Sequence, residues 1–292
     1  MNHRELVKIT TSYDEAVKWL QEKLVIPREK KCICRTKFNM IMLLKKEKFF
    51  WQCSRCDRST SIFTDTILYN SKLSITSILD LIYFWSKDFK QNEAAIEINT
   101  KSKNTCNNWY EKLQKLAYYI MKNEKKKKIG GKDRIVEIDE SKFSKRKYNI
   151  GRNIVSLWVV GGIDVESGDS FFVEVIKRDA TTLRGIILEN VEQGSILHTD
   201  CWRGYINLQD FGYKHYTVNH SQNFVNPSNF CSTQMIEGMW SVYKRKFRSR
   251  YITRRGDLTL YFAEFAFKRK YKDLAFEKII ENLKDSRNKI DF

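Results

Sequence analysis

The sequence predicts a mixed fold of helices and strands arranged in two successive parts, and three observations support this. Strand-like runs such as IVEID, WVVGGID and SFFVEV gather in the second half of the chain, where helical runs separate them. The first half is mostly helical but contains two close pairs of cysteines. The 292 residues are 42% hydrophobic and include only two prolines, so the chain can bury a substantial core.

The chain is strongly basic, with 53 Lys and Arg against 35 Asp and Glu and a formal charge of +18. Such a surplus repels itself, and a polyanionic partner relieves that repulsion. We therefore expect nucleic acid as the partner, ahead of a membrane surface. The zinc ribbon and helix-turn-helix predicted below favour double-stranded DNA. No stretch reaches the roughly 18–20 apolar residues of a membrane-spanning helix, and the charged N-terminus argues against a signal peptide.

The first half divides into two predicted modules, at 1–70 and 71–122. Residues 12–24 have the spacing of an amphipathic helix, and 44–56 read as a strand that enters a tight turn. Further along, an apolar helix begins near Ser74, and two more helical runs are joined by the short turn NTKS. This pair resembles a helix-turn-helix.

The second helix of that pair, from Ser102 to about Gln114, is the predicted recognition helix. Its polar side chains suit base edges and phosphates. The alternative is a helical hairpin that packs beneath another domain. The DNA-contacting candidates on this helix are Lys103, Asn104, Asn107 and Asn108.

The paired cysteines predict a structural zinc site in the first module. Cys53 and Cys56 form a C-x-x-C pair, and Cys32 and Cys34 form a shorter C-x-C pair. This spacing is typical of a zinc ribbon. Seven cysteines are an odd number and a poor disulfide framework, which favours a reducing compartment. The alternative is two pairs of buried thiols without metal.

A basic linker is predicted at 123–134. Four consecutive lysines, Lys125 to Lys128, precede Gly130 and Gly131. The lysine run could serve as a nuclear-import signal or be a solvated charge run.

The third predicted domain spans 135–292. Three strand-like runs separated by GGID and ESGDS suggest antiparallel neighbours, followed by a helix at 181–191 and a strand at 195–200. We then expect a helix near Cys201, a strand at 213–220, a long helix from Thr233 and two C-terminal helices. This order is that of an RNase H-like fold, a mixed sheet flanked by helices.

Three acids occupy conspicuous positions in this domain. Asp139 lies in the first strand, Asp200 ends the strand SILHTD, and Glu237 lies on the polar face of the long helix. Two divalent ions bound by such carboxylates can activate an attacking oxygen and stabilise a leaving one. Each acid has an ordinary alternative: Asp200 could cap a helix, Glu237 could be a surface residue, and alternation does not decide between Asp139 and Glu140.

Several neighbours of the acids are candidate DNA contacts. Lys244 and Arg248 follow Glu237 on the same helix face, and both suit phosphate. Trp202 and Arg203 lie two and three residues after Asp200. Aromatic and histidine side chains at such positions are more often core or supporting residues, although His198 shares the strand face of Asp200.

These motifs resemble a known family. IDESKFSKRKYN, WVVGGID, ILHTDCWRGY, YKHYTVNHSQNFVNP and TQMIEGMWSVYKRKFR are similar to segments of DDE transposases of the Merlin superfamily and of related bacterial insertion-sequence transposases with an ISXO2-like domain. The likeness covers about 135–272 and extends more loosely to the first half. It implies an RNase H-like nuclease with Asp139, Asp200 and Glu237 as metal-binding catalytic acids. It also implies that Lys244 is the basic catalytic residue two helical turns beyond the third acid. The stretch FCSTQ departs from the Gly-Ala-His-Thr type that relatives carry before the third acid.

The resemblance also implies an activity. A cut-and-paste transposase would bind terminal inverted repeats, cleave the element ends with Mg²⁺ or Mn²⁺ and join the 3′-OH to target DNA, as a homodimer or higher synaptic assembly, with Zn²⁺ in the ribbon. The alternatives are a transposase-derived DNA-binding regulator and an RNase H-like nuclease acting on RNA. The nucleus of a eukaryote is the favoured compartment, and the bacterial cytoplasm is the other.

Overall fold

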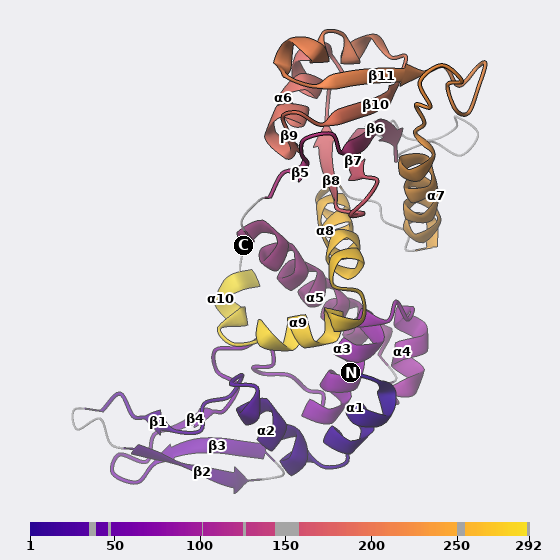
Figure 1. The fold of residues 1–292 in the computed structure, drawn as a ribbon. Coiled ribbons are helices and arrows are strands. Elements are labelled where there is room, and N and C mark those ends of the chain that lie inside the picture. The colour runs from indigo at the N-terminus through magenta and orange to yellow at the C-terminus, as the bar shows by residue number, and fades with distance from the viewer. Residues whose placement is uncertain are drawn as a thin grey trace. The chain divides into compact units, whose positions relative to one another are not determined.

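The computed structural model describes residues 1–292 except 35–38, 46–47, 101, 125–126, 144–157, 250–254 and 291–292. The chain forms two compact units (Figure 1). The first unit contains Met1–Met121 and Phe267–Phe292, and the second contains Lys122–Ala266. Each unit is described by itself below.

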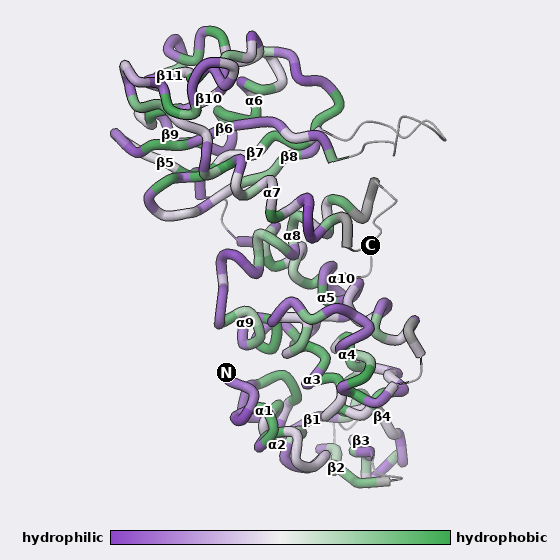
Figure 2. The backbone as a smooth tube through the Cα atoms, turned by 90° about the vertical axis from the view of Figure 1, so that its right-hand side faces the viewer, coloured by the Kyte–Doolittle hydropathy of each residue, from purple (hydrophilic) through white to green (hydrophobic). Residues whose placement is uncertain are grey.

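The first unit is built mainly from helices with defined starts. Ser12 and Ser74 are the N-caps of α2 and α3, where their side chains accept hydrogen bonds from the backbone amides of Glu15 and Ser77. Helix α3 is apolar on most of its surface and is coloured largely green in Figure 2. The helices of this unit are α1 (His3–Ile9), α2 (Tyr13–Glu22), α3 (Ile75–Ser86), α4 (Gln91–Glu97), α5 (Lys103–Asn123), α9 (Ala275–Glu281) and α10 (Ser286–Ile290).

A four-stranded antiparallel sheet in order β1-β2-β3-β4 completes the first unit. Trp51 of β3 is buried in the same core as α3 and α5. The strands are β1 (Lys30–Lys31), β2 (Asn39–Lys45), β3 (Lys48–Cys53) and β4 (Ser59–Ser61).

The second unit contains a five-stranded mixed sheet in order β11-β10-β6-β7-β8. Strands β6, β7 and β8 pair antiparallel, as predicted, whereas β10 lies parallel to both β6 and β11. The strands are β6 (Ile135–Lys142), β7 (Trp158–Asp164), β8 (Ser170–Val175), β10 (Ile196–Asp200) and β11 (Lys214–Val218). A separate short parallel pair joins β5 (Ile129–Gly130) to β9 (Val191–Glu192).

Helices pack on both faces of this sheet (Figure 1). One core contains α6 (Ala180–Asn190) with Val136, Ile138 and Val160 of the sheet. The other contains α7 (Gln234–Ser249) and the first part of α8 (Arg255–Tyr271) with Val159 and Ile163. Successive residues of β7 therefore enter opposite cores, which is the strand alternation that the sequence pattern predicts. The mixed sheet flanked by helices is confirmed.

Two predicted features differ from the structure. The pair Gly161 and Gly162 lies inside β7, and the turn before β8 falls at 165–169. The helix expected near Cys201 is reduced to two short 3₁₀ helices, η2 (Arg203–Tyr205) and η3 (Leu208–Phe211), because left-handed Asn207 and Gly212 bound the second of them.

The grouping of elements into units also differs from the predicted domains. The expected catalytic domain ran to the C-terminus, but Phe276, Ile279 and Leu283 lie in the core of the first unit. The predicted linker at 123–134 contributes β5 to the second unit. In the described part of the chain, no helix is both long and apolar enough to cross a membrane.

Candidate functional site

Strand β6 positions the first acid against helix α7. Val136 and Ile138 face the α6 core, so Glu137 and Asp139 face the opposite side of the sheet. Trp240 Nε1 of α7 donates a hydrogen bond of 3.1 Å to Asp139 Oδ2. Buried Glu137 accepts a 2.9 Å hydrogen bond from the backbone amide of Ile236, in the first turn of α7. Glu137 therefore satisfies the start of the helix and fixes it over the strand.

A glycine makes room for this contact. Gly161 of β7 pairs with Asp139 in the antiparallel register. A Cβ atom at Gly161 would lie 2.6 Å from the Trp240 ring, closer than side chains approach. The sequence WVVGGID thus allows the indole to lie against the sheet and reach the Asp139 carboxylate.

The second acid comes from the neighbouring parallel strand. His198 of β10 pairs with Glu137 of β6, so Asp200 ends β10 level with Asp139. Its Oδ1 accepts a 2.9 Å hydrogen bond from the Trp202 amide, which bends the chain away from the sheet. This local hydrogen bond resembles the predicted capping alternative, but it stabilises a turn.

Three carboxylates meet at this point. One oxygen each from Asp139, Glu140 and Asp200 lies within 4.8 Å of the others. The sequence left open whether Asp139 or Glu140 faces the site. Both carboxylates reach it, from opposite faces of β6.

Glu237 lies next to this group but is held by other partners. Thr233 Oγ1 donates a 2.8 Å hydrogen bond to Glu237 Oε1, and His220 Nε2 lies 3.1 Å from the same oxygen. Thr233 Oγ1 is also 2.8 Å from His220 Nε2, which closes a three-residue contact. The structure therefore brings Asp139 and Asp200 together as predicted, with Glu237 turned toward His220.

The charges of the acids act on one another. Burial raises the pKa of Asp139 to about 6, and the negative charges of Asp200 and Glu237 add to the rise. Burial raises the pKa of Glu140 to about 7, with further contributions from Asp139 and Asp200. A cation between these oxygens would relieve both the repulsion and the cost of burial. Hard oxygen ligands in this number fit Mg²⁺ or Mn²⁺.

Basic and aromatic side chains surround the acids. The guanidinium of Arg178 lies 3.5 Å from the ring centroid of Trp158 and 4.9 Å from that of Trp202, and its charge lowers the pKa of Glu140. Lys244 Nζ lies 5.9 Å from the ring centroid of Phe143. The sequence motifs above assign no role to Arg178, which lies in the segment VIKRDATTL between β8 and α6.

The remaining candidates of the second unit have simpler surroundings. Trp202 is 40% exposed, and its Nε1 donates to the Arg178 carbonyl at 3.3 Å. Arg203 is exposed in η2. The side chain of Arg248 lies outside the described residues.

The four predicted zinc ligands come together in the first unit. One sulfur each from Cys32, Cys34, Cys53 and Cys56 lies within 4.8 Å of the others, and the Cys32 and Cys56 sulfurs are 3.6 Å apart. A tetrahedral zinc with bonds of about 2.3 Å separates its sulfurs by about 3.8 Å. Backbone amide hydrogen bonds from Arg55 and Cys56 lower the pKa of the Cys53 thiol, which favours the thiolate that zinc requires. The cluster is therefore compatible with a zinc ribbon.

The predicted recognition helix corresponds to the start of the longer helix α5. Asn104, Asn107 and Asn108 are exposed there, whereas Cys106 and Trp109 are buried in the core. The side chain of Lys103 lies outside the described residues. Helix α4 precedes α5 after a short turn. A DNA-reading pair and a packed helical hairpin share this arrangement.

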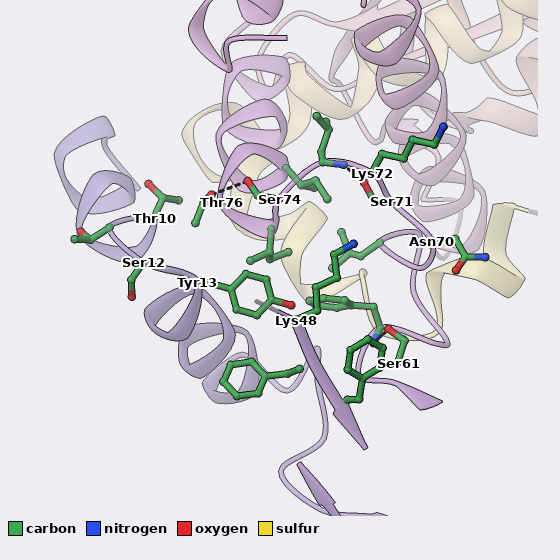
Figure 3. A pocket seen from close by; sticks show the side chains of 18 residues that line it. Thr10, Ser12, Tyr13, Lys48, Ser61, Asn70, Ser71, Lys72, Ser74 and Thr76 are labelled. Carbon is green, nitrogen blue, oxygen red and sulfur yellow. Dashed lines mark hydrogen bonds between the residues drawn. The ribbon is translucent and has the colours of Figure 1, made fainter. Parts of the chain in front are cut away.

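A pocket of about 620 Å³ also lies in the first unit, at the first turns of α2 and α3 and beside β3 and β4 (Figure 3). Tyr13 and Phe49 stack there with ring centroids 5.6 Å apart, and Lys48 and Lys72 add positive charge. No acid, histidine or cysteine lines this pocket. Its lining does not suit a metal cation, in contrast to the two clusters above.

Comparison with known proteins gives the family. The ISXO2-like transposase domain matches residues 117–270, more than half of the chain. No curated protein matches the chain significantly.

Solved structures give looser likenesses. The simian T-cell lymphotropic virus intasome, in complex with PP2A regulatory subunit B56 gamma, aligns with 15% identity over 48% of this chain and 51% of that chain, with a TM-score of 0.33. This chain thus spans about half the length of the chain that it matches in that complex. A Mos1 transposase paired-end complex with the left transposon end gives 10% identity over 69% of this chain and 78% of that chain, with a TM-score of 0.24. A pre-cleavage Mos1 transpososome gives 8% identity over 73% of this chain and 78% of that chain, with a TM-score of 0.22.

TM-scores this low describe a loose likeness only, so the assignment depends on the sequence match. That match agrees with the resemblance found in the motifs around Asp139, Asp200 and Glu237. The chain belongs to the family of transposases with an ISXO2-like domain.

Proposed function

We propose that this chain is a cut-and-paste DNA transposase of the DDE type, which cleaves transposon ends and joins them to target DNA. The observation that carries the proposal is the convergence of partly buried acids from β6 and β10 beside a helix that supplies Glu237. Such a group is costly without a cation and has the ligands that divalent metals prefer.

The acids have defined roles in the proposed reaction. Asp139 and Asp200 would hold Mg²⁺ or Mn²⁺, and Glu237 would complete the site. Bound cations supply activation of the attacking oxygen and stabilisation of the leaving 3′-oxygen. Trp240 keeps the Asp139 carboxylate in place through its 3.1 Å hydrogen bond, and Glu137 keeps α7 in place.

Basic residues of the second unit would hold the DNA strand. Lys244 lies two turns after Glu237 on α7, and Arg203 is exposed beside Asp200. Exposed Trp202 offers a face on which a base could stack. Arg248 follows Lys244 by one turn and is proposed as a further phosphate contact.

The first unit would recognise the terminal inverted repeats. Its cysteine cluster would hold Zn²⁺ and fix the ribbon. Exposed Asn104, Asn107 and Asn108 at the start of α5, together with Lys103, are the proposed base and phosphate contacts. Joining two ends requires a homodimer or a larger synaptic assembly, and a eukaryotic nucleus is the proposed compartment, with bacterial cytoplasm as the alternative.

Metal-dependent cleavage of labelled DNA tests the proposal. The substrates are fragments from both sides of the gene, and the proteins are wild type, Asp200→Asn and the matched control Asp210→Asn, whose residue is exposed in η3. We expect nicking with Mn²⁺ or Mg²⁺, and loss on the order of a thousandfold only in Asp200→Asn. Specific DNA binding without cleavage by wild type would instead identify a transposase-derived regulator. Preferred cutting of RNA–DNA hybrids would identify an RNase H-like nuclease.

A further inference from the structure

Glu140 reaches the acid cluster from the face of the sheet opposite to that of Asp139. Alternation along β6 places Ile138 and Glu140 on the α6 side, where Tyr205 of η2 is buried in the same core as Ile138. Asp139 faces α7 and Trp240. The register of β6 with β10 extends as far as Glu137, and beyond it one oxygen from each of the two adjacent carboxylates lies within 4.8 Å of Asp200 and of the other.

The buried hydroxyl of Tyr205 lies beside the Glu140 carboxylate. Tyr205 is 1% exposed, and its hydroxyl makes no hydrogen bond of ordinary geometry within the described residues. The same holds for Glu140 Oε1, which is also buried. Burial and the negative charges of Glu140, Asp139 and Asp200 raise the pKa of the Tyr205 hydroxyl well above its ordinary range, and its contact with the Glu140 carboxylate adds to the rise.

Two unsatisfied buried polar atoms beside three carboxylates need an explanation. Each such atom ordinarily costs free energy comparable to a lost hydrogen bond. A cation bound by Glu140 would satisfy the carboxylate. The Tyr205 hydroxyl could then donate to the oxygen of Glu140 that does not contact the cation, as supporting residues of metal sites do.

Glu237 does not take this third place in the described structure. Its Oε1 is bound to Thr233 and lies beside His220, whereas Glu140 belongs to the group with Asp139 and Asp200. We propose that Glu140 is a direct ligand of the divalent cation, in addition to Asp139 and Asp200, and that Tyr205 is a positioning residue for it. This inference rests on the proposed cation site of the transposase.

Binding of Mn²⁺ to the full chain, followed by electron paramagnetic resonance and by calorimetry, tests this role without requiring DNA cleavage. Four variants are compared with wild type. Glu140→Gln keeps the shape and removes the charge, Tyr205→Phe removes only the hydroxyl, Asp200→Asn reports on the site as a whole, and Glu192→Gln is a control for an exposed acid of β9.

We expect Glu140→Gln to weaken Mn²⁺ binding at least about tenfold, Asp200→Asn to weaken it at least as much, and Tyr205→Phe to weaken it about threefold. Glu192→Gln should bind as wild type does. Glu140→Asp, which keeps the charge on a shorter side chain, should recover part of the affinity. Thermal unfolding and near-ultraviolet circular dichroism of each variant separate lost binding from lost folding.

Two results would overturn the inference in different ways. If folded Glu140→Gln binds Mn²⁺ with the affinity of wild type while Asp200→Asn loses binding, Glu140 is not a ligand of the metal. The proposed function would still stand. Unchanged binding in both Asp200→Asn and Glu140→Gln would mean that the acids do not form a cation site, and the proposed function would fail as well. If Glu140→Gln does not fold, the partial affinity of Glu140→Asp decides, because a purely structural Glu140 predicts full affinity in any folded acid variant.

Discussion

The two candidate metal sites are assembled in opposite ways. The cysteine cluster of the first unit draws all four ligands from Cys32 to Cys56, a short stretch of one ribbon. The acid cluster of the second unit combines adjacent residues of β6 with Asp200, which enters through a parallel strand far along the chain. A local site can be recognised from spacing, whereas a site of distant residues depends on the topology of the sheet.

The sites also differ in what supports their ligands. Backbone amides of the Cys53 turn support the thiolates directly. The acids instead depend on side chains from other elements: Trp240 for Asp139, and Thr233 with His220 for Glu237. Mutations of supporting residues should therefore affect the acid site more than the cysteine site, and four predictions follow from this contrast.

The largest effect is expected at the local site. Cys53→Ser should reduce zinc content from about one ion per chain to nearly none and unfold the ribbon, because structural zinc contributes on the order of 10 kcal/mol to such small modules. Metal analysis by mass spectrometry and thermal unfolding measure this. Exposed Cys201→Ser is the matched control and should keep its zinc. Equal zinc in both variants would contradict the proposed ribbon.

The next effect concerns the support of the acid site. Gly161→Ala should destabilise the second unit by about 1–3 kcal/mol, because the added methyl group meets the Trp240 ring at 2.6 Å. Gly238→Ala in α7 meets nothing within 4 Å and should stabilise the helix by about 0.5–1 kcal/mol. Chemical denaturation of both variants gives the comparison. Two equal changes would show that Trp240 does not lie against β7 as described.

A pH effect of intermediate size should separate the two sites. The folded-state pKa values are about 6 for Asp139 and about 7 for Glu140, above the values near 4 of the unfolded chain. At pH values between the unfolded and the folded pKa, the metal-free folded chain therefore binds more protons than the unfolded chain. Its free energy of unfolding should therefore fall as pH rises from about 4 to 7 and level off above. Mn²⁺ competes with these protons, so its affinity should rise on the order of tenfold from pH 6 to pH 8. Calorimetry at both pH values checks this, and an affinity independent of pH would contradict the shifted carboxylates.

The smallest effect is expected at the support of Glu237. His220→Ala should lower cleavage activity about threefold to tenfold and leave Mn²⁺ binding by Asp139 and Asp200 nearly unchanged, because it removes one partner of Glu237 and Thr233 remains. His220→Gln, which can still donate a hydrogen bond, should restore part of the activity. A loss of activity as large as that of Asp200→Asn would give His220 a role in the reaction itself.

Much of the fold could be predicted because the signals are local. Alternating and helical periodicity marks β6, β7, β8, α6 and α7, and cysteine spacing marks the ribbon. Asp200 was identifiable at the end of its strand, because neighbouring parallel strands bring their ends to one edge.

The remaining features depend on tertiary contacts. The region after Cys201 contains helix-forming residues, but Asn207 and Gly212 adopt left-handed backbone and limit it to 3₁₀ turns. Helix α9 packs in the first unit because its apolar face fits that core, which periodicity cannot assign. Likewise, no local pattern shows that Glu137 caps α7 or that Arg178 lies between two tryptophans.

The most direct test of the acids as metal ligands is to locate Mn²⁺ by anomalous X-ray diffraction from crystals of the full chain. We predict a peak about 2.2 Å from carboxylate oxygens of both Asp139 and Asp200. A fully occupied manganese bound elsewhere, with those two side chains free of metal, would contradict the account.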